Sequence, residues 1–291
     1  MIVVTTNAGL TLRAAIVSIV LLALLLGVWH LATLPSGAAA VKLTPEEIEY
    51  QKMLGKDPGA GAKQNNGFPT LAQMRDTVVA NLAHPFYDNG PNDKGIGIQL
   101  AHSLGRVGLG FGLAALVAVP LGFVIGMSPL MYRALDPFIQ VLKPISPLAW
   151  MPLALYTIKD SSISGIFVIF ICSVWPMLLN TAFGVAGVRR EWLNVAKTLE
   201  VTPLRTAFEV ILPAAAPTIV TGMRISMGIA WLVIVAAEML VGGTGIGYFV
   251  WNEWNNLSLT NVIFAILVIG VVGMVLDLLF ARLQKAISYV D

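Results

Sequence analysis

The stretch RREWLNVAKTLEVTPLRTAFEVILP, from Arg189 to Pro213, separates two long apolar runs of the chain. Its first half predicts a short amphipathic helix, because apolar residues recur at helical spacing. These residues are Trp192, Val195, Ala196 and Leu199. The residue before a proline disfavours the helical conformation, so Pro203 predicts a helix end at Thr202. Residues 204–212 should form a second short helix, with Pro213 in the first turn of the next apolar run.

The composition is that of a membrane protein. Of the 291 residues, 57% are hydrophobic and 12% are charged, whereas soluble domains carry about 25% charged residues. The net charge of +2 is too small to indicate nucleic-acid binding. The single cysteine, Cys172, rules out an intrachain disulfide and is expected to pack within a helix.

The N-terminal region predicts one span followed by a polar arm. Residues 1–34 contain an apolar run long enough to cross a bilayer. A removable signal peptide is the alternative, but its apolar core would be about 7–15 residues, shorter than this run. We therefore favour a retained first transmembrane helix. Residues 35–98 are rich in Gly, Pro and Asn and should form an extracytoplasmic arm with amphipathic segments, such as residues 68–82.

Five further apolar runs predict five more spans. They cover residues 99–127, 135–158, 162–185, 213–241 and 260–283. Residues 99–285 thus form a five-helix transmembrane core, with a loop at 186–212 and a tail at 286–291. The expected fold class is an all-α polytopic membrane protein with six transmembrane helices.

Basic residues predict the orientation of these spans. One side of the membrane would carry Arg13, Arg133, Arg189, Arg190, Lys197, Arg205, Arg282 and Lys285. The opposite short loops offer only Lys159, and residues 242–258 contain no Lys or Arg. The positive-inside rule therefore places both termini and the 186–212 loop in the cytoplasm.

Two spans carry helix-breaking or small residues. The run at 135–158 contains four prolines, which predict a broken helix of the kind that lines a solute path. The run at 99–127 has two GxxxG spacings, at Gly108/Gly112 and Gly122/Gly126, which predict close helix packing within the bundle.

Ionisable side chains inside spans are candidate functional groups, because lipid tolerates them poorly. Arg106, near His102, could instead extend to the headgroups, and Lys143 could extend to the cytoplasmic surface. Arg224 either faces the solute path or pairs with another helix. Glu238 either lines a gate or caps a packing contact. The predicted path residues are Lys143, Ser146, Trp150, Arg224 and Glu238; Lys143 and Arg224 in one cavity would suit a small anion.

Several chemistries have no signature in the sequence. No G-x-x-x-x-G-K-[ST] phosphate loop occurs, and GGTGIG (residues 242–247) lacks the lysine and is expected to be an outward turn. Three histidines and one cysteine form no ligand cluster, and no nucleophile–base set stands out. We therefore expect no catalytic residue, no metal and no cofactor in this chain.

The opening stretch resembles the cytoplasmic coupling loop of importer permeases of the ATP-binding-cassette superfamily. That loop reads Glu-Ala-Ala, three residues, Gly, nine residues, Ile-x-Leu-Pro. Here Ala196, Val210, Leu212 and Pro213 match it, whereas Asn194 replaces Glu and Glu200 replaces Gly. These two departures resemble those of the nitrate/sulfonate/taurine group of permeases. Within that group the resemblance is closest to nitrate or bicarbonate permeases. Residues 92–128, 142–156 and 228–259 support that branch.

The resemblance implies a complex of several chains in a bacterial inner membrane. Two permease copies would form the pore, two ATPase subunits would bind ATP and Mg, and an extracytoplasmic binding protein would deliver solute. The ATPases would contact Glu191, Trp192, Val195, Ala196, Lys197, Leu199, Glu200 and Pro213. The binding protein would contact Trp251, Asn252, Glu253 and Trp254.

The sequence leaves three kinds of function to compare. The resemblance implies import of a small anion, nitrate or nitrite first, bicarbonate next and an alkanesulfonate such as taurine third. A secondary transporter or channel acting alone would need an internal repeat and paired acids, neither of which is evident. A membrane-embedded enzyme would need a nucleophile or metal set. The coupling helix could also pack only on the chain's own bundle.

Overall fold

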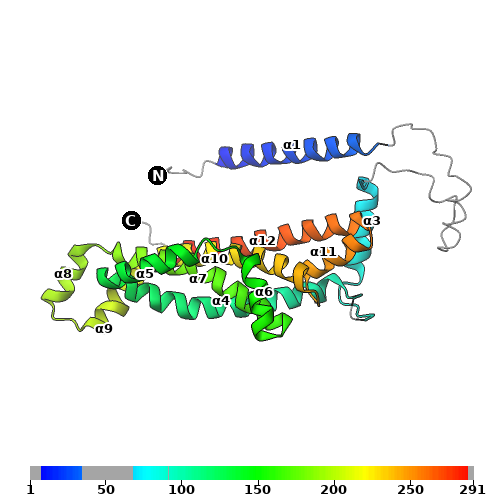
Figure 1. Ribbon diagram of the computed structural model, residues 1–291. Helices are drawn as coiled ribbons and strands as arrows, with labels where there is room; N and C mark the ends of the chain where they lie inside the picture. Colours follow the sequence, from blue (N-terminus) through cyan, green and yellow to red (C-terminus); the bar gives the residue numbers. More distant parts are fainter. Residues whose placement is uncertain (1–7, 35–67, 91, 288–291) are drawn as a thin grey trace, which may run out of the picture. The chain divides into compact units, whose positions relative to one another are not determined.

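The computed structural model describes residues 8–34, 68–90 and 92–287, and helices dominate them (Figure 1). In this part of the chain, the β-structure is a single isolated bridge between Asp88 and Lys94. The predicted all-α class is confirmed. Much of the predicted arm, residues 35–67, and the last four residues of the predicted tail, 288–291, lie outside the described residues.

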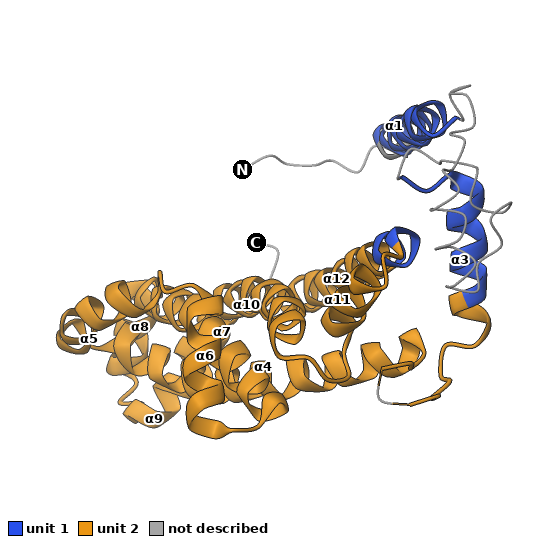
Figure 2. Ribbon diagram, turned by 45° about the vertical axis from the view of Figure 1, so that its right-hand side comes forward, with its two compact units in different colours: residues 1–80, 259–264 blue, residues 81–258, 265–291 orange. Residues whose placement is uncertain are grey.

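The chain divides into two compact units (Figure 2), residues 1–80 with 259–264 and residues 81–258 with 265–291. The first unit holds α1 (Ala8–Ala32) and most of α3 (Leu71–Ala83). Here the Trp29 indole nitrogen donates to the Pro69 carbonyl oxygen at 2.9 Å. The Trp29 ring also meets Phe68 edge-on, with 5.5 Å between centroids. These contacts hold the end of α1 against the segment that leads into α3.

The second unit contains the helices that position the candidate site. They are α4 (Ile96–Met127), α5 (Pro129–Leu142), α6 (Pro147–Ile158), α7 (Ser161–Ala186), α8 (Arg190–Thr198), α9 (Pro203–Thr206), the π-helical turn η1 (Ala207–Ile211), α10 (Leu212–Val241), α11 (Ile246–Asn255) and most of α12 (Leu259–Ile287). Helix α7 packs against both α4 and α10, α6 packs on α7, and α11 packs on α10 and α4.

The apolar core of this unit lies between α4, α5 and α7. Its buried members are Phe111, Ala114, Ala118, Ile125, Ile139, Val174, Met177, Leu178 and Ala182. Between helices in lipid, close packing rather than release of water supplies the attraction, so small residues matter. A Cβ on Gly122 would lie 2.7 Å from the Leu178 carbonyl oxygen, so glycine permits the close approach of α4 to α7.

Only half of the predicted glycine packing occurs within the chain. Gly126, like Gly122, lies against α7, where a Cβ would be 2.6 Å from the Ala182 carbonyl oxygen. Gly108 and Gly112 instead face open space, with no atom within 4 Å of an added Cβ. The spacing was right for both pairs, but the rotation of α4 turns the first pair away from the bundle.

Among the described residues, five helices are long and apolar enough to cross a membrane. Their spans are Leu12–Ala32, Ile96–Met127, Ser161–Ala186, Pro203–Val241 and Leu259–Ile287. A sixth crossing is possible only if α5 and α6 count as one span, since they meet at 90°. The predicted break in the third span is confirmed, but the predicted bounds are wrong: α5 begins at Pro129, because Ser128 caps it by accepting from the Met131 amide at 3.3 Å.

The predicted separate helix at 204–212 is also corrected. Helix α9, the π-helical turn and α10 run on as one helical segment, Pro203–Val241. Pro213 does not interrupt it, because a proline in the first turn of an α-helix removes an amide that would have no partner. The loop at 186–212 therefore consists of one separate short helix, α8, and a helical extension of α10.

Candidate functional site

The turn that ends α8 contains Glu200, which stands where the coupling-loop pattern has glycine. The Glu200 amide donates to the Lys197 carbonyl at 3.1 Å, and the Val201 amide to the Ala196 carbonyl at 3.0 Å. These two bonds form a Schellman motif, in which the residue at Glu200 takes a left-handed conformation. Glu200 has φ +53°, a region that glycine adopts more easily. The replacement of Gly by Glu therefore keeps the turn.

The apolar face of α8 is mostly uncovered in the single chain. Ala196 is buried, and Leu193 packs on an apolar cluster formed by the ends of α7 and α10 and the π-helical turn. Trp192, Val195 and Leu199 are 46%, 58% and 71% exposed. Glu191, Lys197, Glu200 and Pro213 are exposed as well. Contacts within the chain therefore use only the inner edge of α8.

The bend between α5 and α6 borders a cavity of about 280 Å³. Lys143, Ser146 and Trp150 line it, together with Trp175 of α7 and Ile229 of α10. Lys143 follows the last residue of α5, and Ser146 precedes Pro147 at the start of α6. The break thus brings together three of the predicted path residues at one cavity. Lys143 gives the lining of this cavity one positive charge.

Arg224 does not line this cavity, so the expected joint cavity with Lys143 is not found. Its Nε and Nη2 each donate to one carboxylate oxygen of Asp277 on α12, both at 2.6 Å. Arg224 and Asp277 are 37% and 52% exposed, and both line a separate groove of about 380 Å³ between α10 and α12. Of the two alternatives, pairing with another helix describes the single chain.

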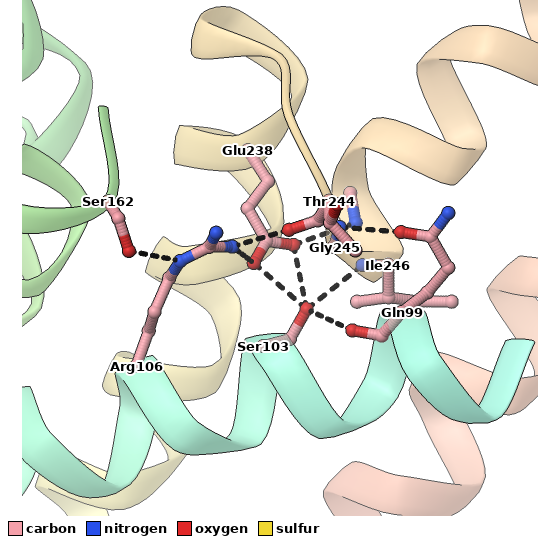
Figure 3. Close-up of polar contacts among 9 residues, drawn as sticks. Gln99, Ser103, Arg106, Ser162, Glu238, Thr244, Gly245 and Ile246 are labelled. Carbon is pink, nitrogen blue, oxygen red and sulfur yellow. Dashed lines mark hydrogen bonds and ion pairs between the residues drawn. The ribbon is translucent and has the colours of Figure 1, made fainter. Parts of the chain in front are cut away.

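Glu238 lies in a buried polar network rather than along an open path (Figure 3). Its side chain is 4% exposed, and its Oε1 accepts from Arg106 Nη1 at 2.7 Å. The other oxygen, Oε2, accepts from Ser103 Oγ at 2.8 Å and from the Gly247 amide at 3.0 Å. In the single chain the Glu238 carboxylate therefore makes a packing contact, and Arg106 pairs with it instead of extending to the headgroups.

The same network holds the loop between α10 and α11 (Figure 3). Arg106 Nη1 donates to the Thr244 carbonyl oxygen at 2.7 Å. Gln99 Oε1 accepts from the Gly245 amide at 2.6 Å, and Ser103 Oγ accepts from the Ile246 amide at 2.9 Å. Arg106 Nε also reaches Ser162 of α7 at 3.0 Å. The start of α11 is thereby tied to α4 and α10.

Glycine is required where this loop passes the carboxylate. A Cβ on Gly245 would lie 2.2 Å from Glu238 Cδ, which is too close for two non-bonded carbon atoms. The predicted outward turn GGTGIG is thus a turn built around one carboxylate. Gln99 and Ser103 were not identified from the sequence as hydrogen-bond partners of the loop between α10 and α11. Their spacing from Arg106 was the available signal, since all three lie on one face of α4.

The predicted binding-protein contacts lie on α11, and two of them are exposed aromatics. Trp251 and Trp254 are 43% and 58% exposed. Asn252 is partly buried and donates to the Asn92 carbonyl oxygen at 3.3 Å, and Glu253 is partly buried as well. Helix α11 therefore presents two indole rings at its surface, while Tyr248 and Asn252 contact the segment before α4.

Comparison with known proteins gives the family of this chain. Residues 118–289 match the family described as binding-protein-dependent transport system inner membrane component. The chain is 43% identical to the nitrate import permease protein NrtB of Synechocystis sp. over 77% of this chain and 82% of that protein. It is 45% identical to the bicarbonate transport system permease protein CmpB of the same organism, over 71% and 74%. The taurine transport system permease protein TauC of Escherichia coli is 32% identical, over 65% and 69%.

The fold has a counterpart among solved structures. The inward-facing MetNI methionine ABC transporter matches with a TM-score of 0.58 and 13% identity, over 65% of this chain and 94% of that chain. At this identity the likeness concerns the fold alone. The sequence family covers more than half of the chain, including α7, α8 and α10. The chain therefore belongs to the family of binding-protein-dependent transport system inner membrane components, the permease subunits of ATP-binding-cassette importers.

Proposed function

We propose that this chain is the membrane-spanning subunit of an ATP-driven importer for a small planar oxyanion. Nitrate or nitrite is the first choice and bicarbonate the second. The observation that carries the proposal is the identity of 43% and 45% to a nitrate and a bicarbonate permease. Nitrate and bicarbonate are both singly charged and trigonal, so one cationic path would serve either. An alkanesulfonate such as taurine comes third, because that relative is only 32% identical.

Helix α8 would transmit the movement of the ATPase subunits. Its support is the exposed face of Trp192, Val195 and Leu199, which is apolar and lies on a loop that the charge pattern places in the cytoplasm. A short amphipathic helix commonly docks by laying its apolar face into a groove of a partner. The alternative, in which α8 packs only on its own bundle, leaves these three side chains without a role.

The cavity at the α5–α6 bend would form part of the solute path. It contains Lys143, Ser146 and Trp150, which offer a cation and a hydroxyl in an otherwise apolar lining. Such a site would attract an anion while binding it weakly enough for release. Glu238 would act from outside the path, because its carboxylate holds the loop that leads to α11.

The exposed indoles of α11 would meet the extracytoplasmic binding protein. Trp251 and Trp254 lie close together on one short helix, and the network around Glu238 holds that helix in place. Tryptophan is enriched at the energetic centre of protein interfaces. In this arrangement both termini are cytoplasmic, the first span is retained, two permease copies form the pore and two ATPase subunits bind ATP and Mg.

Transport by the reconstituted complex tests this function. Permease, ATPases and binding protein would be placed in liposomes, and ATP hydrolysis would be measured with nitrate, nitrite, bicarbonate or taurine outside. Stimulation by nitrate supports the first choice, and stimulation by bicarbonate without nitrate would reverse the order. Anion uptake by the permease alone, without ATPases, would instead identify a secondary transporter or channel.

A further inference from the structure

We infer that Arg224 is an intramembrane binding site for the transported planar oxyanion and that the Asp277 carboxylate occupies this site when the anion is absent. The inference rests on the proposed function and locates one step of the path. Its starting point is the paired geometry, in which two nitrogens of Arg224 each donate to one oxygen of Asp277 at 2.6 Å. A guanidinium fork recognises planar oxyanions in this way.

The pair lies near the middle of two candidate membrane spans, Pro203–Val241 and Leu259–Ile287. Arg224 is about 18 Å along α10 from Leu212, and Asp277 is about 15 Å along α12 from Ile287, at 1.5 Å per residue. The hydrocarbon core of a bilayer is about 30 Å thick. Both residues are nevertheless 37% and 52% exposed in the single chain. Exposed charges at this depth are unfavourable against lipid, so this face has to meet water or protein.

There is room for an anion beside the pair. The groove of about 380 Å³ is lined by Arg224 and Asp277 and by small residues that include Gly228 and Gly270. A Cβ on either glycine would meet no atom within 4 Å. Helix α12 is held to α10 by separate polar contacts, such as that from Gln284 Nε2 to Thr221 Oγ1 at 2.9 Å. The helices therefore have other links when the Arg224–Asp277 contact opens.

The Asp277 carboxylate has the shape and charge of the proposed cargo. Nitrate and bicarbonate also present two oxygens on a trigonal centre and carry one negative charge. Either anion could therefore replace the carboxylate in the fork of Arg224 with both hydrogen bonds retained. The displaced carboxylate stays nearby and repels the bound anion. A competitor of this kind keeps binding weak, which a transport site needs for release.

Nitrate binding to the permease–ATPase complex in nanodiscs, without binding protein, tests the site. Sodium nitrate would be titrated at constant ionic strength while the melting temperature is recorded, since a bound ligand raises it. Asp277→Asn removes the competitor and should lower the half-maximal nitrate concentration by roughly tenfold. Arg224→Lys keeps the charge but loses the fork, and should raise that concentration by roughly tenfold.

Gln284→Leu is the matched control, because it breaks a neighbouring contact between α10 and α12 without changing a charge. It should titrate like the unmodified complex. If Arg224→Lys and Asp277→Asn also titrate like Gln284→Leu, the exchange site is wrong. Should Asp277→Asn fail to assemble with the ATPases, Arg224→Lys decides, since it retains a charge pair.

Uptake separates this inference from the proposed function. The complete complex with its binding protein would be assayed for uptake of nitrate, nitrite and bicarbonate. If the unmodified complex takes up none of these anions, the proposed function is wrong. If it takes up any of them and both Arg224→Lys and Asp277→Asn leave KM and kcat unchanged, only the exchange site is wrong.

Discussion

Arg106 of α4 and Glu238 of α10 form a largely buried ion pair, with 2.7 Å between Nη1 and Oε1. The pair also holds the loop that follows α10. Arg106 donates to the Thr244 carbonyl oxygen, and Glu238 accepts from the Gly247 amide. Because α11 begins within this loop, the position of its exposed indoles depends on the pair. A contact that looks like helix packing therefore orients a candidate docking surface.

Replacing Glu238 with Gln should lower the free energy of unfolding by up to about 3 kcal/mol, because Arg106, which is only 14% exposed, would lose its counter-charge. Urea titration of the detergent-solubilised protein, followed by tryptophan fluorescence, measures the change. Glu209→Gln is the control, since that carboxylate pairs with Arg205 on an exposed surface at 2.8 Å. Its effect should stay below about 1 kcal/mol. Equal effects of the two substitutions would show that burial is not the cause.

Gly245→Ala should loosen the loop between α10 and α11, because the new Cβ would lie 2.2 Å from Glu238 Cδ. Amide hydrogen exchange measures this directly, and the amides of residues 245–247 should exchange faster. Gly228→Ala provides the control, because a Cβ there meets no atom within 4 Å. Unchanged exchange in Gly245→Ala would mean that the loop does not need this close approach.

Glu200→Gly should stabilise the turn after α8 relative to Glu200→Ala, by about 1 kcal/mol, because glycine adopts the left-handed region without a Cβ clash. Both substitutions remove the same charge, so their difference isolates the backbone effect at φ +53°. The free energies of unfolding of the two variants provide the measurement. A lower stability for Glu200→Gly would contradict the left-handed turn.

Aspartate at both Trp192 and Leu199 should release the ATPase subunits while leaving membrane insertion intact. Each apolar anchor in a protein interface contributes on the order of 2 kcal/mol, so co-purified ATPase should fall by more than about tenfold. Leu257→Asp is the control, because Leu257 is 90% exposed and follows α11. Full recovery of the ATPases with the double variant would count against docking through α8.

Lys143→Met should reduce nitrate uptake, as kcat/KM, by about tenfold to a hundredfold, because a charge-assisted contact contributes about 1.5–3 kcal/mol. Lys159→Met is the matched control, since Lys159 is exposed and caps the far end of α6. Assembly with the ATPases would be checked in both variants. Uptake that is equally reduced in the two would exclude a specific role for the cavity at the α5–α6 bend.

Local sequence patterns predicted the elements well where few neighbours decide the outcome. The length of an apolar run follows from the thickness of the bilayer. The spans outside the broken one were therefore predictable to within a few residues, except that the segment Pro203–Val241 begins ten residues before its predicted start. Pro144 and Pro147 marked the break, because a proline has no amide hydrogen to donate to a helical hydrogen bond. The spacing of Trp192, Val195 and Leu199 predicted an amphipathic helix, because helical periodicity is also a local property of the chain.

The candidate site was less predictable, because it depends on rotations and depths of helices. Arg224 was recognised as a charge within a span, but its partner Asp277 lies 53 residues away. Gly108 and Gly112 had the right spacing, yet they face open space. Spacing along one helix places residues on a common face and leaves open what that face meets.

The sequence by itself determined the membrane-spanning helices, the short amphipathic helix in the charged loop and the resemblance to a coupling loop. Each of these rests on apolar length, helical periodicity or a local motif. Only the tertiary structure decided that Arg106 meets Glu238 across 132 residues and that Glu200 keeps the turn that a glycine would make. Packing of α4, α7 and α10 sets the rotation and depth of each helix, and those two quantities select the partners of its charges.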